Sequence, residues 1–252
     1  MCGSIGCDML SRHLSKIKNK YGIDFTVVNG ENSADGNGIT PSSADCLLNI
    51  GADVITGGNH SFRREEMLPV YEENTFVLRP DNINAYNFGS GYCVVDKGRY
   101  KIAVINLSGR IYLERQEADN PFTAADLLVA RAKQDGANVI LVDFHAEATS
   151  EKRAFGIYLD GSVSAVFGTH THVQTYDWQI LPSGTGYITD LGMTGPKQSV
   201  LGVKSDIIIN RLRNNDMSRF QLADGPCMIN GCIFEIDEKT GKTIDVMGIS
   251  IE

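Results

Sequence analysis

The sequence lacks several features that would define its class at once. Its six cysteines include no Cys-x-x-Cys pair, so neither a zinc knuckle nor a disulfide framework is indicated, and reduced thiols fit best. There is no signal peptide and no apolar run of about 18 residues, so neither export nor a membrane span is predicted. Acidic residues outnumber basic ones, with 31 Asp and Glu against 23 Lys and Arg. We therefore expect no stable binding to nucleic acid. The predicted location is the cytoplasm.

The rest of the composition is that of an ordinary globular protein. The chain has 252 residues, of which 42% are hydrophobic and 21% charged, enough for one sizeable α/β core. We expect residues 1–252 to form a single domain. Apolar runs alternate with stretches of helical periodicity, which predicts βαβ units whose strands are buried on both faces. In such sheets, sites form beyond the carboxyl ends of the strands.

The expected elements follow from the periodicity of the apolar residues. Helices are predicted at 8–20, 42–50, 63–67, 123–135 and 205–213. Strands are predicted at 25–29, 54–56, 76–80, 92–95, 103–106, 139–145, 186–190, 228–235 and 244–249, with one more inside 162–172. Residues 1–6 are interpreted as a glycine-bearing loop, with Asp8 as a helix cap or first-turn charge.

The most informative stretch is 168–172, Gly-Thr-His-Thr-His, at the end of an apolar run. On extended backbone, His170 and His172 lie on the same side, which is a spacing typical of metal ligands. A single histidine at a strand end is more often a hydrogen-bonded polar residue. Here, however, His145 also ends an apolar run, and His60 follows a Gly-Gly-Asn sequence.

Seven polar residues therefore follow four predicted strands. They are Glu31, Asn32, Asn59, His60, His145, His170 and His172. Carboxylate and amide oxygens together with neutral imidazoles suit Mn²⁺, Fe²⁺ or Zn²⁺ rather than Ca²⁺ or a thiolate-bound zinc. Seven ligands are too many for one open catalytic metal, but they suit two ions about 3.5–4 Å apart, the arrangement that promotes in-line displacement at phosphorus.

Three motifs add a resemblance to a known family. They are 57–60 (GGNH), 143–152 (DFHAEATSEK) and 168–175 (GTHTHVQT). They resemble the signatures of calcineurin-like metallophosphoesterases and, more narrowly, the bacterial YmdB-type 2′,3′-cyclic-nucleotide 2′-phosphodiesterases. Further matching segments lie at 28–32, 79–80, 105–110, 120–122 and 189–196. The resemblance implies an α/β sandwich of mixed β-sheets flanked by helices. It also implies two divalent metal ions, Fe or Mn, with Zn or Mg as alternatives.

The same resemblance implies a role for each site residue. Glu31 would bridge the two metals. Asn32 and His172 would face the first metal, and the second would be held by Asn59, His145 and His170. His60 would contact the phosphate and protonate the leaving oxygen. Attack in line by a metal-bridging hydroxide on a 2′,3′-cyclic nucleotide would then give a 3′-nucleotide.

One part of the family pattern is missing. Such enzymes begin with a strand that ends in Gly-Asp, whose Asp binds the first metal, and this sequence starts in the following loop, at 2–6 (CGSIG). We therefore expect the fold to lack its first β-strand here, the first metal to bind weakly, and the strand to be encoded upstream of Met1. Asp8 lies too late in the chain to replace the missing ligand.

Several alternatives stay open at this stage. The same two-metal core would serve a phosphomonoesterase or 5′-nucleotidase, and a catalytically impaired protein that senses nucleotide or metal is a third hypothesis. A homo-oligomer is possible. Arg79 and Arg110 fit either phosphate binding or surface salt bridges, and Asp143 and Glu147 fit either partners that orient His145 or helix-start and surface charges. Residues 35–38 are interpreted as a turn near the site.

Overall fold

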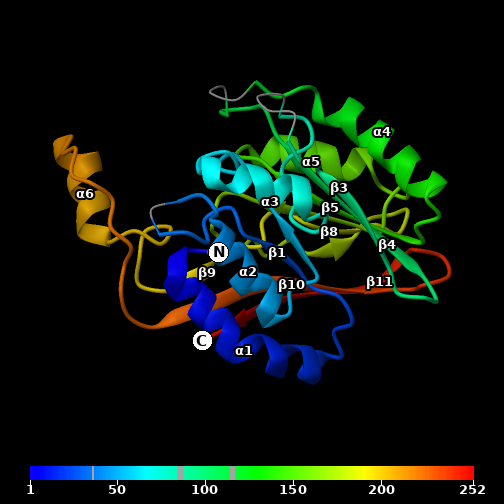
Figure 1. The fold of residues 1–252 in the computed structure, drawn as a ribbon, viewed down its shortest axis with the longest axis horizontal. Helices are drawn as coiled ribbons and strands as arrows, with labels where there is room; N and C mark the ends of the chain where they lie inside the picture. Colours follow the sequence, from blue (N-terminus) through cyan, green and yellow to red (C-terminus); the bar gives the residue numbers. More distant parts are fainter. Residues whose placement is uncertain (36, 84–87, 114–116) are drawn as a thin grey trace.

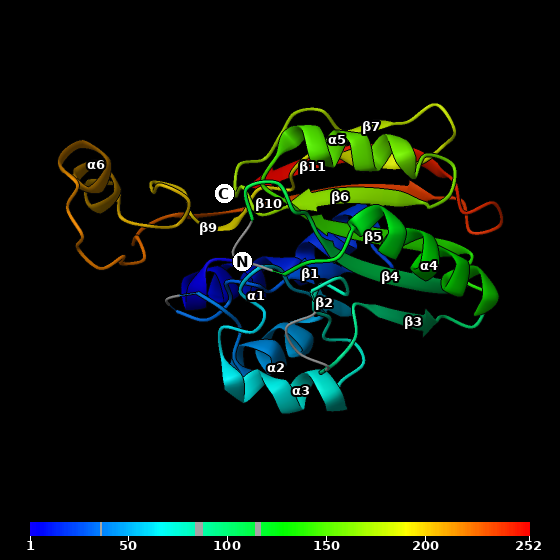
Figure 2. The ribbon, with the colours of Figure 1, turned by 90° about the horizontal axis from the view of Figure 1, so that it is seen from above.

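The computed structural model describes residues 1–35, 37–83, 88–113 and 117–252, so Gly36 of the expected turn lies outside the described residues. A six-stranded sheet forms the centre, in the order β3-β4-β5-β6-β8-β7 (Figures 1 and 2). Its strands are β3 (Tyr92–Asp96), β4 (Lys101–Ser108), β5 (Val139–His145), β6 (Ala165–Thr169), β7 (Gln179–Ile180) and β8 (Gly186–Ile188). The four inner strands are parallel, and the edge strands β3 and β7 are antiparallel to their neighbours.

Two smaller sheets make up a second layer. One pairs β1 (Val27–Asn29) with β2 (Val54–Thr56) in parallel. The other is antiparallel and has the order β11-β10-β9, formed by β9 (Thr194–Pro196), β10 (Cys227–Ile236) and β11 (Thr243–Ile251). Among the described residues, these two sheets share no strand.

Two of the described helices have side-chain caps at their amino termini. The described helices are α1 (Gly3–Tyr21), α2 (Pro41–Ile50), α3 (Leu68–Glu73) after a 3₁₀ turn at Glu65–Met67, α4 (Pro121–Gln134), α5 (Thr149–Tyr158) and α6 (Ser205–Asn214). Thr40 and Ser43 form a capping box before α2, and the Asn120 side chain caps α4. Proline occupies the first turn of both helices, where its missing N–H costs nothing.

Three apolar clusters define the layers. The first lies between the six-stranded sheet and helices α4 and α5, and it includes Phe144 and Phe155. The second packs α1 and α2 on the outer face of the smaller sheets. The third, around Leu141 and Phe167, lies between the layers of sheet. The result is the predicted α/β sandwich of mixed sheets flanked by helices.

The first helix begins earlier than expected. It starts at Gly3, so residues 3–6 are helical and Asp8 is an exposed residue of its second turn rather than a cap. The glycines here serve close packing instead of a loop, since a Cβ on Gly6 would lie 2.6 Å from the carbonyl oxygen of Thr194. A glycine was the wrong signal for a loop at this place.

Two other predictions were wrong in part. Residues 76–80 form a single parallel bridge between Ile55 and Val77 instead of a strand, and the strand expected at 25–29 is confined to β1.

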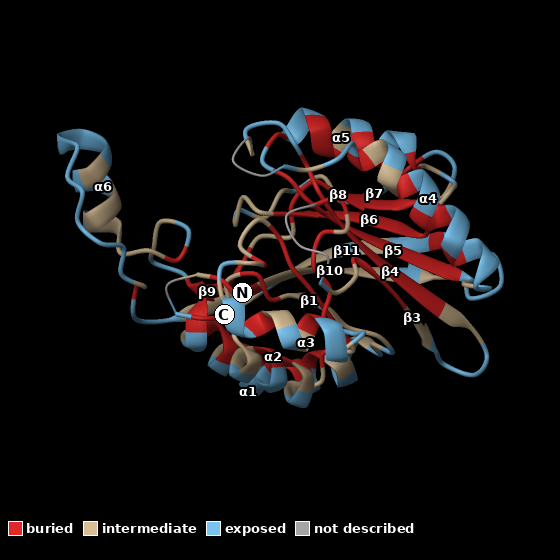
Figure 3. Ribbon diagram, turned by 45° about the horizontal axis from the view of Figure 1, so that its top comes forward, coloured by how far each residue is buried: buried red, intermediate tan, exposed pale blue. Residues whose placement is uncertain are grey.

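A protruding arm, defined here as residues 204–221, carries α6 away from the sandwich (Figures 1 and 3). No residue of α6 is buried, and the apolar side chain of Leu212 is 80% exposed. At the base of the arm, Val203 and Leu222 form an antiparallel bridge. No helix in the described part of the chain is long and apolar enough to cross a membrane.

Candidate metal centre

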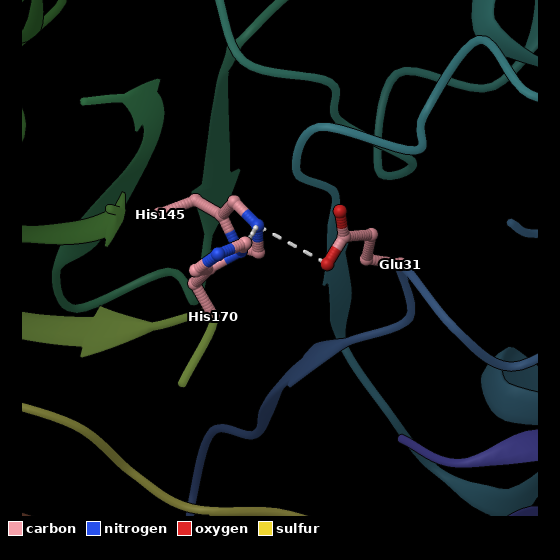
Figure 4. Close-up of side chains that lie close together, drawn as sticks. All are labelled: Glu31, His145 and His170. Carbon is pink, nitrogen blue, oxygen red and sulfur yellow. Dashed lines mark hydrogen bonds and ion pairs between the residues drawn. The ribbon is translucent and has the colours of Figure 1, made fainter. Parts of the chain in front are cut away.

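The carboxyl ends of β1, β2, β5 and β6 meet at one edge of the sandwich, and the predicted site residues lie there. Glu31 follows β1, Asn59 and His60 follow β2, His145 ends β5, and the His170 loop follows β6. Figure 4 shows the rings of His145 and His170 close together, opposite the Glu31 carboxylate. Ligand atoms of these three residues lie within 4.8 Å of one another.

The hydrogen bonds of His145 fix which ring nitrogen carries the proton. The Thr169 hydroxyl donates its only proton to the Asp143 carboxylate at 2.7 Å. It therefore accepts from His145 Nδ1, which lies 2.9 Å away. The free lone pair is then on His145 Nε2, which lies 2.9 Å from Asn59 Oδ1 and 3.1 Å from Glu31 Oε2.

His170 is oriented in the same manner by a different carboxylate. Its Nε2 lies 2.8 Å from the Glu147 carboxylate and donates to it, so the lone pair is on Nδ1. That Nδ1 lies 3.0 Å from His145 Nε2. Two ring lone pairs, a carboxylate oxygen and an amide oxygen thus face one another with no proton among them, an arrangement that a cation satisfies.

The charges of the cluster also suit a cation. Although burial alone would raise it, the neighbouring His145 and His60 lower the pKa of Glu31 to about 2, so the carboxylate is ionised. Burial, with a further contribution from His145, lowers the pKa of His170 to about 4, and burial lowers that of His172. Neutral imidazoles and an ionised carboxylate are the forms in which these side chains bind metals.

The remaining predicted residues lie on the other side of Glu31. Asn32 Nδ2 donates to Glu31 Oε2 at 3.3 Å and lies 3.4 Å from His172 Nε2. His172 Nδ1 donates to the carbonyl oxygen of Leu201 at 3.1 Å, which directs its Nε2 inward. His60 Nδ1 lies 3.1 Å from Asn32 Oδ1, and its backbone N–H donates to Glu31 Oε1 at 2.8 Å. All seven predicted residues therefore form one connected cluster.

Beneath the cluster lies an apolar slot, the cavity between β1 and β10. Its volume is about 800 Å³. Apolar and polar side chains both line it, and site residues are among them; the apolar ones include Leu10, Leu14, Val27, Leu141, Phe167 and Ile233. β1 pairs with β2 on one edge, and its other edge has no strand partner among the described residues. The same is true of the edge of β10 that faces away from β11, beyond Ile229. The slot is thus bordered by two unpaired strand edges.

Predictions for the neighbouring charges need correction. Asp143 is linked to His145 through the Thr169 hydroxyl, and Glu147 contacts His170. Arg79 forms no surface salt bridge with a described residue. Its side chain is buried and donates to backbone carbonyls, among them those of Pro80, Asp81 and Phe88.

Sequence reasoning missed the polar network under the site. Asp143 is fully buried and accepts from the side chains of Thr56, Thr169 and Asn29. A carboxylate inside an otherwise apolar strand was the available signal, because such a group needs several donors. Thr169 aligns with His145 in the β5–β6 pairing, which the sequence alone does not show.

A sandwich of mixed sheets with this cluster at its strand ends defines the calcineurin-like metallophosphoesterase fold, in a class of hydrolases that act on phosphoester bonds. The profile of one family, described as "YmdB-like protein", matches residues 1–249. The chain belongs to this family.

Individual relatives agree with this assignment. The 2′,3′-cyclic-nucleotide 2′-phosphodiesterase of Bacillus subtilis (strain 168) is 44% identical over 249 residues, which are 99% of this chain and 93% of the relative. The crystal structure of a Mycoplasma pneumoniae phosphatase has a TM-score of 0.93 at 34% identity, covering 99% of this chain and 90% of its own. A hypothetical protein from Thermus thermophilus has a TM-score of 0.88 at 34% identity, covering 99% of this chain and 95% of its own.

Proposed function

We propose that this protein is a metal-dependent phosphodiesterase that hydrolyses 2′,3′-cyclic nucleotides to 3′-nucleotides. The observation that carries the proposal is the group of proton-free acceptor atoms on Glu31, Asn59, His145 and His170. The activity of the Bacillus subtilis relative, at 44% identity, supports this substrate class.

The residues present fit one divalent cation and supply part of a site for a second. Asn59, His145 and His170 would hold one ion, His172 and Asn32 would face the other, and Glu31 would bridge them. Iron or manganese suits this mixture of oxygen and imidazole ligands, with zinc or magnesium as alternatives. When bound, such ions lower the pKa of a water molecule and offset the negative charge on the phosphate.

His60 is the residue placed to handle the leaving group. Its Nδ1 faces Asn32 and Glu31, and about a third of its side chain is exposed, so its Nε2 can reach a substrate outside the ligand cluster. Burial lowers the pKa of His60, while the Glu31 carboxylate opposes that shift. We assign His60 the donation of a proton to the departing 2′ oxygen.

Hydrolysis of 2′,3′-cyclic AMP, with the product separated as 3′-AMP or 2′-AMP, tests the function. We expect 3′-AMP from the parent chain and none from a His145→Ala variant. His13→Ala, which changes a histidine of α1 outside the cluster, is the matched control. Hydrolysis of AMP or p-nitrophenyl phosphate without cleavage of the cyclic substrate would replace the proposal with the phosphomonoesterase alternative.

We further propose that the slot accepts an extended apolar strand that enters it ahead of Met1 and brings a carboxylate to the first metal position. Two sheet edges without strand partners in the described part of the chain, together with an apolar lining, are the surroundings that a buried strand needs. The expected strand would join the two small sheets into one.

The position of Met1 supports the direction of this strand. Its amino group donates to the carbonyl oxygen of Asn29 at 3.2 Å, beside the carboxyl end of β1. A strand that ends there and runs parallel to β1 would be followed by α1 and then by β1, which is a βαβ unit. Its last residue would lie beside Glu31 and His172, which line the same end of the slot.

Metal content per chain tests the strand proposal. A chain extended before Met1 by Ile-Leu-Phe-Ile-Gly-Asp is expected to hold two Mn²⁺ and to hydrolyse 2′,3′-cyclic AMP faster than the parent. The matched control ends in Gly-Asn, which keeps the strand and removes the carboxylate. Equal metal content and activity in all three chains would refute a ligand from this strand.

Cellular location and assembly are also proposals. All six cysteines are free thiols, which supports the reducing cytoplasm. The exposed apolar side chains of the protruding arm, such as Leu212 and Met217, support a homo-oligomer. Light scattering coupled to gel filtration measures the mass directly, and a monomer at every concentration would refute the oligomer.

A further inference from the structure

Outside the atoms that face the candidate cation, the structure buries a second charged pair. Lys152 of α5 and Asp190, which follows β8, are each 1% exposed, and Nζ lies 2.6 Å from Oδ2. Desolvation of such a pair offsets much of its attraction, and apolar replacements are often as stable. A contribution to stability is therefore a weak explanation for this buried pair. Its contacts indicate a different role.

Asp190 holds the loop that carries two of the site histidines. Its Oδ2 accepts the backbone N–H of Thr171 at 3.0 Å, and its Oδ1 accepts that of Gly192 at 2.9 Å. Thr171 is the residue between His170 and His172. One carboxylate thus fixes the backbone at the centre of the His-x-His segment.

That backbone is one the loop would not adopt without support. The φ angle is +107° at His170 and +62° at His172, a region that residues other than glycine rarely occupy. Such conformations persist only where the surroundings determine them. The hydrogen bond from the Thr171 N–H to Asp190 holds the backbone between His170 and His172, the two residues with positive φ.

Lys152 connects this loop to the neighbouring strand. It lies in the first turn of α5, shortly after His145, and its side chain passes Gly168, where a Cβ would lie 3.0 Å from Lys152 Cδ. The ammonium therefore links the end of β5 to the loop after β6. We propose that Lys152 is a positioning residue, which fixes Asp190 and thereby the backbone that directs the rings of His170 and His172 into the cluster. The identity of the ligand as a metal rests on the proposed function.

Two measurements test this role. The first is hydrogen exchange of the Thr171 amide by NMR, and the second is Mn²⁺ affinity by calorimetry. In Lys152→Met we expect the Thr171 amide to exchange at least 100-fold faster and Mn²⁺ to bind at least 10-fold more weakly. Val129→Ala, a buried change on α4 far from the loop in sequence, should lower stability while leaving both readouts near the parent values.

A second variant keeps the test decisive if Lys152→Met does not fold. Lys152→Met combined with Asp190→Asn leaves no unpaired buried charge, and the same two losses are expected. Exchange of Thr171 and Mn²⁺ affinity within twofold of the parent in this variant would overturn the inference. Absence of Mn²⁺ binding by the parent would refute the proposed metal centre, while Thr171 exchange would still decide the role of Lys152.

Discussion

Among single residues, His60 offers a test that separates the proposed catalytic role from metal binding. It contacts Glu31 and Asn32 but lies outside the group of facing lone pairs. Because a general acid contributes about 10²–10⁴-fold, His60→Asn should lower kcat for 2′,3′-cyclic AMP by that factor. Its Mn²⁺ content should equal that of the parent. Loss of metal together with activity would show that His60 is a ligand instead.

The thiols give a second prediction at the scale of residues. Burial raises the pKa of Cys7 to about 11 and that of Cys93 to about 12, whereas Cys46 is exposed. The thiolate is the reactive form, so Cys46 should react fastest with Ellman's reagent in the native chain. Cys46→Ser should remove the fast phase. A fast phase that survives this substitution would mean that another cysteine is accessible.

The position of the candidate residues at strand ends could be predicted from the sequence, because they follow continuous apolar runs. Val139 to His145 is such a run, and its histidine lies where a buried parallel strand ends. The supporting contacts could not be predicted in the same way. The bond between Asp190 and Thr171, and the path from Asp143 through Thr169 to His145, depend on which strands become neighbours. Periodicity along one segment carries no such information.

At the scale of elements, Gly168 sets the contact between β6 and the segment after β8. A Cβ there would lie 1.8 Å from the carbonyl oxygen of Thr189. Overpacking of this kind costs about 2–3 kcal/mol, so Gly168→Ala should lower the melting temperature by about 5–10 °C. Gly231→Ala in β10 is the control, because its nearest side-chain atom lies 3.7 Å away. Equal melting temperatures of the two variants would contradict the close approach.

For the protruding arm, we predict almost no effect on stability. Lys204 donates its backbone N–H to the carbonyl oxygen of Gln221 at 3.0 Å, so the chain enters and leaves the arm at adjacent positions. Replacing residues 205–220 with Asn-Gly, a pair that suits tight hairpins, should change the free energy of unfolding by less than about 1 kcal/mol. Urea denaturation measures this. A larger loss would show that the arm packs on the sandwich.

Elements were predicted well where local signals and packing agree. Residues 54–56 and 139–145 have the predicted bounds, and strands were expected at 92–95 and 103–106, where β3 and β4 lie. Prediction failed where a residue packs against a segment that is far away in the sequence. Gly6 lies inside α1 because β9 approaches it, and a local interpretation of glycine as a loop residue cannot detect that approach.

For the whole molecule, the slot between the small sheets gives a prediction about stability. Its apolar lining and the two sheet edges that border it lack a partner strand among the described residues. A strand inserted there would bury apolar side chains worth about 1.5–3 kcal/mol each and would supply hydrogen bonds to both edges. The smaller sheets would then form one continuous sheet behind the site.

This argument gives a prediction independent of catalysis. The chain extended by Ile-Leu-Phe-Ile-Gly-Asp should melt at least 10 °C higher than the parent, since each kcal/mol raises the melting temperature of a chain of this size by about 2–4 °C. Amides of β1 and of β10 beyond Ile229 should exchange more slowly in the extended chain, because open edges become paired. An extension of Ser-Asn-Ser-Asn-Gly-Asp, equal in length and carboxylate but polar, should do neither. If the apolar extension leaves the exchange of both edges unchanged, the slot does not accept a strand, and the proposal of a strand ahead of Met1 fails.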